Sequence, residues 1–266
     1  IISSISTSWG SYLNSTEDNS NGTISIVTSG VEDNQILTIS LNSIDYTGTI
    51  SSNSTTITIP STDLQAFVDG TTYTISANVD DQAENSASTL STSFVYDITH
   101  PTLSGVSLAS NNAVSTLAKV DDVVTLTFTA SESIEQPTVV FKSNDQSIND
   151  SSISYQNTSG NTWTASYTVI NGDSNGTVSY TIDYNDLAGN DGSTVSIGSG
   201  NVTIDTNPPT ITSINPNWGS YLNSTEDNSS GSVTVQTSNV EDGQTLTISL
   251  NSIDYTGTIS SNSTTI

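Results

Sequence analysis

The chain has 266 residues and a formal net charge of −25, because 27 acidic residues are balanced by only two lysines, Lys119 and Lys142, and by no arginine. A surface so poor in positive charge is an unsuitable partner for nucleic acid or for an anionic membrane. The lack of cysteine excludes disulfides, thiolate zinc sites and a cysteine nucleophile, and no apolar stretch approaches the length of a membrane span.

A long internal repeat organises the chain. Residues 9–19 return unchanged at 218–228, and about three quarters of the positions are identical between residues 5–57 and 214–266. The repeating unit is too long for one small β-domain, and it is divided by similar proline-containing segments at 97–101 and 205–209. The sequence therefore predicts a type A domain at 1–99, a type B domain at 100–208 and a partial second copy of type A at 209–266.

Apolar residues alternate with polar ones along most of the first domain, which predicts β-strands with one buried face. The predicted strands are 2–7, 23–29, 35–41, 44–50, 55–60, 71–79 and 91–96. The alternation breaks between Ser61 and Phe67, where Ser61 or Thr62 is expected to cap one helical turn.

The second domain shows the same alternation. It predicts strands at 102–108, 123–130, 137–142, 153–155, 162–169, 177–184 and 193–204. About seven short strands per domain are typical of a Greek-key sandwich. The predicted fold class is all-β, with tandem Ig-like Greek-key β-sandwich domains arranged as an extended rod.

The three tryptophans allow two interpretations. Trp163 alternates with apolar neighbours and is expected to lie in a core. Trp9 and Trp218 each precede a glycine soon after the start of a type A copy. They are expected to pack on the adjoining domain, and the alternative is a stacking platform for carbohydrate.

Three short motifs occur in order in the first domain: Glu-Asp-Asn-Gln at 32–35, Asp-Gln-Ala-Glu-Asn at 81–85 and Val-Tyr-Asp-Ile-Thr-His-Pro at 95–101. The second domain has Thr-Ala-Ser-Glu at 129–132, Asp-Leu-Ala-Gly-Asn at 186–190 and a proline-rich segment at 203–209. Together these motifs resemble the bacterial Ig-like repeats of giant secreted adhesins and biofilm-associated proteins. In that family the first two motifs commonly carry glycine where this chain has Asn34 and Glu84.

This resemblance implies an extracellular stalk at the cell surface, stiffened by calcium at the domain junctions. The geometry of an Ig-like sandwich predicts a similar site, because the loops after the second and sixth strands lie at the end where the chain enters. Glu132 and Asp186 would share that end of the second domain, and Asp97 would reach it from the linker. Calcium suits such a site because it is a hard ion with oxygen ligands.

The same reasoning predicts further cation ligands at equivalent places. Asp205 is expected beside Glu241 and Asp242. The others are Glu32, Asp33, Asp80 and Asp81 beside an upstream linker, and Glu17 and Asp18 near Asp97. The alternative is that these acids only solvate turns, where Asp is common for backbone reasons.

No catalytic arrangement is recognisable. The single histidine, His100, sits beside a proline in a linker, and the paired acids fall in polar loops rather than in a desolvated pocket. The sequence therefore predicts a non-catalytic spacer whose partners are further repeats of the same chain. The alternative function is a repeated binding module for surface glycans or neighbouring chains.

Overall fold

The computed structural model describes residues 1–149 and 152–266 and divides into two compact units, Ile1–Ile204 and Asp205–Ile266. The first unit contains two separate hydrophobic cores, one formed by residues between Ile2 and Tyr96 and the other by residues between Leu108 and Ile204. The division at residues 99 and 208 that the repeat predicts stays a prediction.

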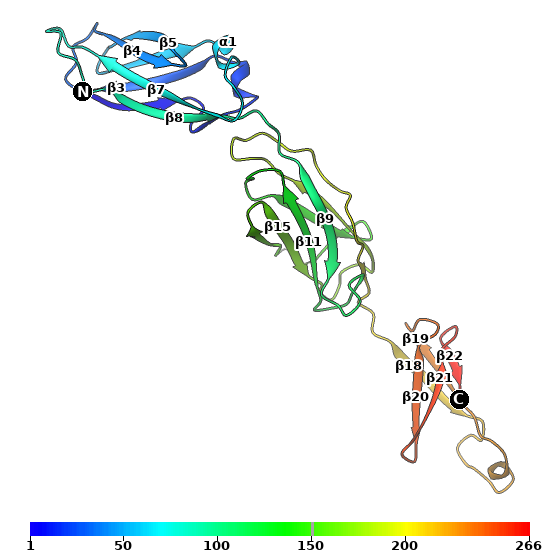
Figure 1. The fold of residues 1–266 in the computed structure, drawn as a ribbon. Helices are drawn as coiled ribbons and strands as arrows, with labels where there is room; N and C mark the ends of the chain where they lie inside the picture. The colour runs from blue at the N-terminus through cyan, green and yellow to red at the C-terminus, as the bar shows by residue number, and fades with distance from the viewer. Residues whose placement is uncertain (150–151) are drawn as a thin grey trace. The chain divides into compact units, whose positions relative to one another are not determined.

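The first core lies between the two sheets of a sandwich, which we call the first sandwich (Figure 1). One sheet has the order β1-β3-β6 and the other β2-β8-β7-β4-β5. Its elements are β1 (Ile2–Thr7), β2 (Tyr12–Leu13), η1 (Glu17–Asn19), β3 (Gly22–Thr28), β4 (Ile36–Leu41), β5 (Ile44–Thr49), β6 (Ser54–Ile59), α1 (Ser61–Leu64), β7 (Thr71–Val79) and β8 (Leu90–Tyr96).

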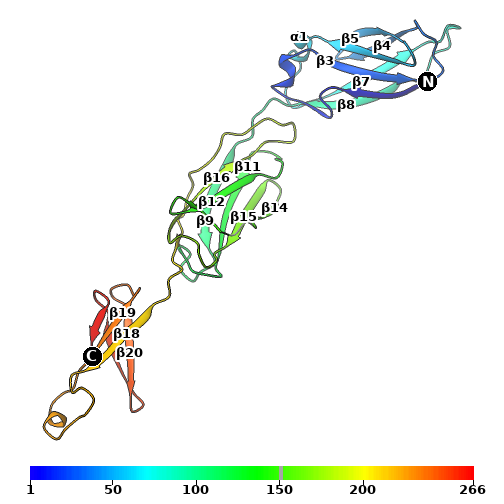
Figure 2. The same cartoon turned by 180° about the vertical axis from the view of Figure 1, so that it is seen from behind.

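The second sandwich is built in the same way from β9 to β17 (Figure 2). Its sheets have the orders β14-β15-β11-β9 and β10-β17-β16-β12-β13. The strands are β9 (Leu103–Ser110), β10 (Leu117–Ala118), β11 (Val123–Ala130), β12 (Thr138–Ser143), β13 (Gln146–Ser147), β14 (Ser154–Ser159), β15 (Thr162–Thr168), β16 (Gly176–Asp183) and β17 (Thr203–Ile204). Both sandwiches thus have the Ig-like Greek-key arrangement that the alternation predicts.

Alternation predicted the long strands well because each buries one face. Every second residue of β11, from Val124 to Ala130, is buried, and β12 repeats the pattern. The two-residue strands β2, β10 and β13 were missed, because two residues carry no period. Strand 153–155 was predicted too short, since β14 continues to Ser159.

Two local predictions were wrong. The long last strand at 193–204 is reduced to β17, because Gly200 has a positive φ of 74° and brings the chain against the backbone of Leu108. The helical turn α1 exists, but neither Ser61 nor Thr62 caps it. Pro60 precedes the helix, and no side chain makes a cap hydrogen bond.

The second unit repeats part of the first sandwich. It contains β18 (Thr210–Pro216), η2 (Glu226–Asn228), β19 (Val233–Ser238), β20 (Thr245–Leu250), β21 (Ile253–Thr258) and β22 (Ser263–Thr265). Its sheets are β18-β19-β22 and β20-β21. Residue Ile266, the last of the sequence given, corresponds to Ile57, so strands β7 and β8 have no counterpart here.

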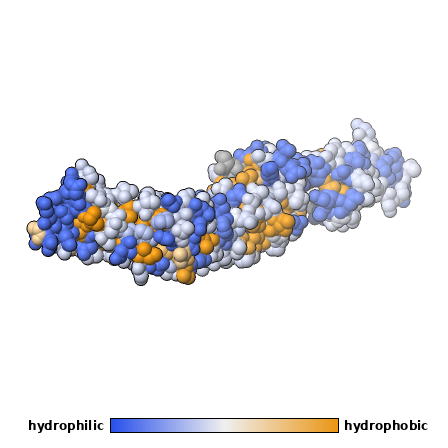
Figure 3. Space-filling model, turned by 90° about the horizontal axis from the view of Figure 1, so that it is seen from above, coloured by the Kyte–Doolittle hydropathy of each residue, from blue (hydrophilic) through white to orange (hydrophobic). Residues whose placement is uncertain are grey.

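The missing counterparts explain an exposed apolar face in this unit. Leu13 and Leu41 are 0% and 1% exposed, whereas the corresponding Leu222 and Leu250 are 58% and 54% exposed. Elsewhere, apolar surface is scattered among hydrophilic residues on the face of the molecule that Figure 3 shows.

Candidate metal centre

The loop at residues 186–190, which we call the entry loop of the second sandwich, holds a buried carboxylate. Asp186 is 1% exposed, and both of its carboxylate oxygens accept hydrogen bonds of 2.8 Å from Asn190, one from the backbone N–H and one from Nδ2. The backbone of Asp186 closes the loop by donating to the Asn190 carbonyl at 3.1 Å. Gly189 permits this closure because its φ is 88°.

Two further carboxylates meet Asp186 at this end of the sandwich. Asp97 follows β8 directly, and Glu132 follows the end of β11. One carboxylate oxygen from each of Asp97, Glu132 and Asp186 lies within 4.8 Å of the others. It is the one such carboxylate group among the residues that the structure describes. The sequence prediction named these three acids, and the structure brings them together.

The electrostatics of this carboxylate cluster (Asp97, Glu132 and Asp186) favour a cation. Burial raises the pKa of Asp97 above its ordinary value, and the negative charges of Asp186 and Asp69 raise it further. Burial also raises the pKa of Glu132, as do the charges of Asp97, Asp186 and Asp69. Negative charges that face one another in a partly desolvated space repel, and a bound cation removes that repulsion.

The donor set fits calcium. All donors are carboxylate oxygens, and histidine and cysteine are absent from the cluster. Ligands on opposite sides of a calcium ion are separated by about 4.6–5.2 Å, so oxygens within 4.8 Å of one another can share one ion. Magnesium demands stricter octahedral geometry and retains several waters, so it suits such a carboxylate cluster less well.

Asp69 is a neighbouring acid that the sequence analysis missed. Its carboxylate accepts hydrogen bonds from the Ile98 backbone N–H at 2.9 Å and from the Thr99 hydroxyl at 2.5 Å. These bonds, that from Thr99 above all, hold the pKa of Asp69 below its ordinary value. The sequence feature that could have identified Asp69 is the Asp-Gly turn just before β7. This turn lies at the end of the first sandwich where the linker leaves.

Hydrogen bonds join the two sandwiches beside the cluster. Asn190 is 2% exposed, and its Nδ2 donates to the Asp97 carbonyl at 2.8 Å. Its Oδ1 accepts from the backbone N–H and the hydroxyl of Ser15, at 3.2 and 3.0 Å. Asn14 Nδ2 donates to the Ala188 carbonyl at 2.8 Å. His100 also contacts the Asp191 carbonyl through Nδ1 at 2.8 Å, which is a structural role.

Glu17 and Asp18 lie near this junction but outside the cluster. Glu17 accepts a hydrogen bond from the Asn14 backbone N–H at 3.2 Å, and burial raises its pKa. Asp18 is 6% exposed and accepts the Tyr96 hydroxyl proton at 2.6 Å inside the first sandwich. Asp18 is therefore engaged in the fold of its own domain.

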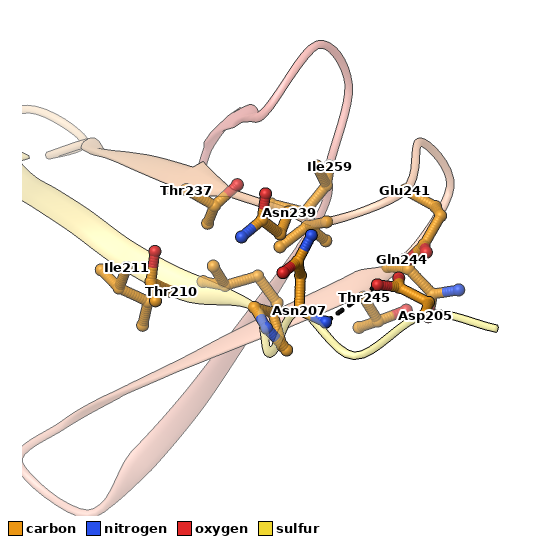
Figure 4. A pocket seen from close by; sticks show the side chains of 13 residues that line it. Asp205, Asn207, Thr210, Ile211, Thr237, Asn239, Glu241, Gln244, Thr245 and Ile259 are labelled. Atoms are coloured by element: carbon orange, nitrogen blue, oxygen red, sulfur yellow. Dashed lines mark hydrogen bonds between the residues drawn. The ribbon is translucent and has the colours of Figure 1, made fainter. Parts of the chain in front are cut away.

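Two of the three acids predicted in the second unit line one pocket (Figure 4). Asp205 and Glu241 line it together with Gln244, and Asp205 accepts a hydrogen bond from the Asn207 backbone N–H at 3.0 Å. Asp242 does not line this pocket. Its carboxylate accepts from the Ser261 backbone N–H at 2.6 Å.

The four acids predicted as cation ligands at the start of the first sandwich each interact with a different partner. Asp33 accepts from the Ser52 backbone N–H at 2.7 Å, and Glu32 accepts from that of Gln82 at 3.3 Å. Asp80 pairs with Ser86 in an isolated bridge. Asp81 accepts two bonds from Asn85, at 2.8 and 2.9 Å, which lower its pKa.

Trp9 is not a platform for carbohydrate. It is 7% exposed in the core of the first sandwich and meets Phe94 edge to face, with ring centroids 5.2 Å apart. The prediction that it packs on the adjoining domain was wrong, because it packs within its own domain. Trp163 packs against the second core as predicted. Trp218 is half-buried beside the exposed apolar face of the second unit.

Comparisons with known proteins give matches at the level of structure alone. No family model matches the chain, and neither does any curated protein. A calcium-stabilised adhesin with which an Antarctic bacterium reaches out and binds ice is 19% identical, with a TM-score of 0.43 over 100% of this chain and 66% of that one. A 1.5-MDa bacterial ice-binding adhesin is 17% identical, with a TM-score of 0.42 over 100% and 85%.

A tetra-tandem repeat from the extending region of a large adhesion protein is 15% identical, with a TM-score of 0.33 over 98% of this chain and 64% of that one. Repeat domains of bacterial adhesins are thus among the structural neighbours of the chain, as the sequence motifs predict. All three TM-scores are below 0.5, so the function of this chain is inferred from its own sequence motifs and geometry. No helix among the described residues is long and apolar enough to cross a membrane.

Proposed function

We propose that the chain is a non-catalytic spacer from a repetitive bacterial surface adhesin or extracellular filament, in which calcium at a domain junction restrains the linker. The convergence of Asp97, Glu132 and Asp186 supports this proposal, because the three acids come from a linker and from two loops of the next sandwich. One calcium ion bound by all three would tie the linker to that sandwich. Asp205 and Glu241, which line one pocket of the second unit, would supply carboxylate ligands of the same kind there.

Several features support a role without catalysis. The carboxylate cluster contains no histidine or cysteine, and each sandwich has a filled apolar core. The burial of Trp9 removes the most obvious surface for a glycan in the first sandwich. The spacer therefore explains more of the chain than the alternative of a repeated glycan-binding module does. Its further repeats would be the main partners, outside the cell.

Calcium titration of the full chain tests the proposal. We expect calcium to bind and to raise the unfolding temperature with concentration, since a ligand at 100 times its Kd stabilises the folded state by about 2.7 kcal/mol. Asp97→Ala is expected to lose one calcium equivalent in calorimetry and the associated thermal shift. Magnesium should substitute poorly.

Asp45→Ala is the matched control, because it removes the same charge from an exposed position on β5. It should leave the calcium stoichiometry unchanged. Equal losses in Asp97→Ala and Asp45→Ala would reduce the effect to general charge screening. No heat of calcium binding in the unaltered chain would leave these acids as solvated turns.

A further inference from the structure

The contact between the two sandwiches is a pairing of two loops, and the chain contains each loop twice. Residues 14–19, which we call the exit loop, contact the entry loop at 186–190. The exit loop recurs at 223–228 with an identical sequence. A loop of the same form as the entry loop closes at 81–85. The two duplicates allow each loop to be compared with its own repeat.

The exit loop has the same internal hydrogen bonds with and without its partner. The Asn14 N–H donates to Glu17 Oε2 at 3.2 Å, and the Asn223 N–H donates to Glu226 Oε2 at 3.0 Å. Asn19 Nδ2 and its counterpart Asn228 Nδ2 each donate to the serine carbonyl four residues earlier at 2.6 Å. The docking conformation therefore forms without a partner, so little ordering entropy is lost on contact.

The entry loop is equally preformed. Asn85 donates to both oxygens of Asp81 at 2.8 and 2.9 Å, as Asn190 does to Asp186 at 2.8 Å. The two loops differ in sequence at two positions, Gln82 against Leu187 and the residue before the asparagine, and the latter bears on the contact with Asn14. It is Glu84, with φ 66°, in the first sandwich and Gly189, with φ 88°, in the second.

This one position faces the docking contact. A Cβ atom placed on Gly189 would lie 3.4 Å from Nδ2 of Asn14, the atom that donates to Ala188. A methyl group there is in ordinary van der Waals contact, so the longer side chain of glutamate would have to find room beside Asn14. It would also add a negative charge beside the carboxylate cluster.

We propose that this position determines which domain docks on the exit loop: glycine, as at Gly189, admits the entry loop of the second sandwich, whereas glutamate, as at Glu84, excludes that of the first. Within one chain the sequence already fixes which domain follows, so this selection determines whether the junction between neighbouring domains closes. It combines a fit to one partner with a clash and a charge against the other. It involves no cation and goes beyond the spacer role proposed above.

Hydrogen exchange of single backbone amides in the full chain, measured by NMR in a chelating buffer, tests the proposal. Gly189→Glu should speed exchange of the Ser15 N–H by about tenfold, the factor that corresponds to loss of one hydrogen bond. The Asn190 N–H should stay protected, because the loop with Glu84 closes with the same bond at Asn85. Gly189→Ala carries the same backbone strain with little bulk, so it should leave Ser15 protected.

Two results would overturn the selection. One is a Ser15 N–H that exchanges as slowly in Gly189→Glu as in the unaltered chain. The other is a Ser15 N–H that exchanges as fast in Gly189→Ala as in Gly189→Glu, which would make backbone strain the cause. If Gly189→Glu also exposes Asn190, the loop itself has opened, and Asn14→Ala decides. That variant should expose Ser15 while Asn190 stays closed, and Asn223→Ala, its matched control, should not. Protection of Ser15 in Asn14→Ala would refute docking through these loops.

Discussion

The duplicated residues show how strongly the environment of a side chain determines its role. Asp18 is buried and accepts the Tyr96 hydroxyl, whereas Asp227, in the identical loop of the second unit, lies in a segment without buried residues. The same contrast holds between Asn190, which is buried at the junction, and Asn85, which is exposed. Each contrast arises because the covering element, β8 for Asp18 and the exit loop for Asn190, has no counterpart within residues 1–266 beside Asp227 or Asn85.

Substitution of Glu132 should change the pH dependence of stability. The pKa of Glu132 is higher in the folded state than its ordinary value of 4.5. Such an acid stabilises the folded state at pH values below the ordinary pKa, and this stabilisation is lost as the pH rises through the pKa of the folded state. In chelator near pH 7, Glu132→Gln should therefore be more stable than the unaltered chain, by less than about 1 kcal/mol because solvent screens the charge. Below the ordinary pKa the difference should vanish.

Thermal unfolding across this pH range measures the effect. With saturating calcium, Glu132→Gln should instead be less stable than the unaltered chain, because the substitution removes a charged ligand of the ion. Glu135→Gln, at an exposed position of the same loop region, should show neither change. A Glu132→Gln variant that is less stable in chelator at pH 7 would contradict the repulsion that the cluster implies.

At the scale of the element, packing of the first sandwich depends on a glycine where β3 begins. A Cβ atom on Gly22 would overlap the ring of Trp9 and would lie 3.2 Å from Cδ1 of Leu64. Trp9 cannot move away freely because it packs against Phe94 and is 7% exposed. The strand therefore needs a residue without a side chain at this point.

Gly22→Ala should destabilise the first sandwich by about 1–3 kcal/mol, the usual cost of overpacking a filled core. The matched change, Gly231→Ala, meets Trp218 in the same way, but that ring is half-buried and can shift. It should cost less. Urea unfolding followed by tryptophan fluorescence measures both, and equal losses would show that the packing of Trp9 is not the cause.

At the scale of the whole molecule, the dominant quantity is the net charge of −25. The one salt bridge among the described residues joins Lys119 to Asp122 at 3.3 Å, so nearly all carboxylates lack a positive partner from the protein. Repulsion of this kind weakens a compact state and is screened by salt over about 10 Å at 0.1 M and about 3 Å at 1 M.

Sodium chloride should therefore raise the unfolding temperature of the chain in chelator at pH 7, by a few degrees between 0.05 and 1 M as an order of magnitude. The rise should shrink at a pH where most carboxylates are protonated. Thermal scans at both pH values measure it. An unfolding temperature that falls with salt at neutral pH would mean that attraction between charges outweighs their repulsion.

Much of this architecture follows from local sequence. Alternation in segments such as 123–130 determines a strand with one buried face, and the repeat of residues 9–19 determines that the same loop occurs twice. Because Ig-like loops alternate between the two ends of a sandwich, the meeting of Asp97, Glu132 and Asp186 could be predicted as well. These features depend on chain periodicity and connectivity, which a sequence records directly.

Tertiary structure decided the rest. It turned Asp18 towards Tyr96, placed Trp9 within its own core and added Asp69 beside the cluster through bonds to Ile98 and Thr99. It also replaced most of the strand predicted at 193–204 with a segment that crosses to the other sheet. In each case the deciding contact joins residues far apart in the chain. Its strength depends on burial and on the geometry of the partner, and neither quantity is present in the local sequence.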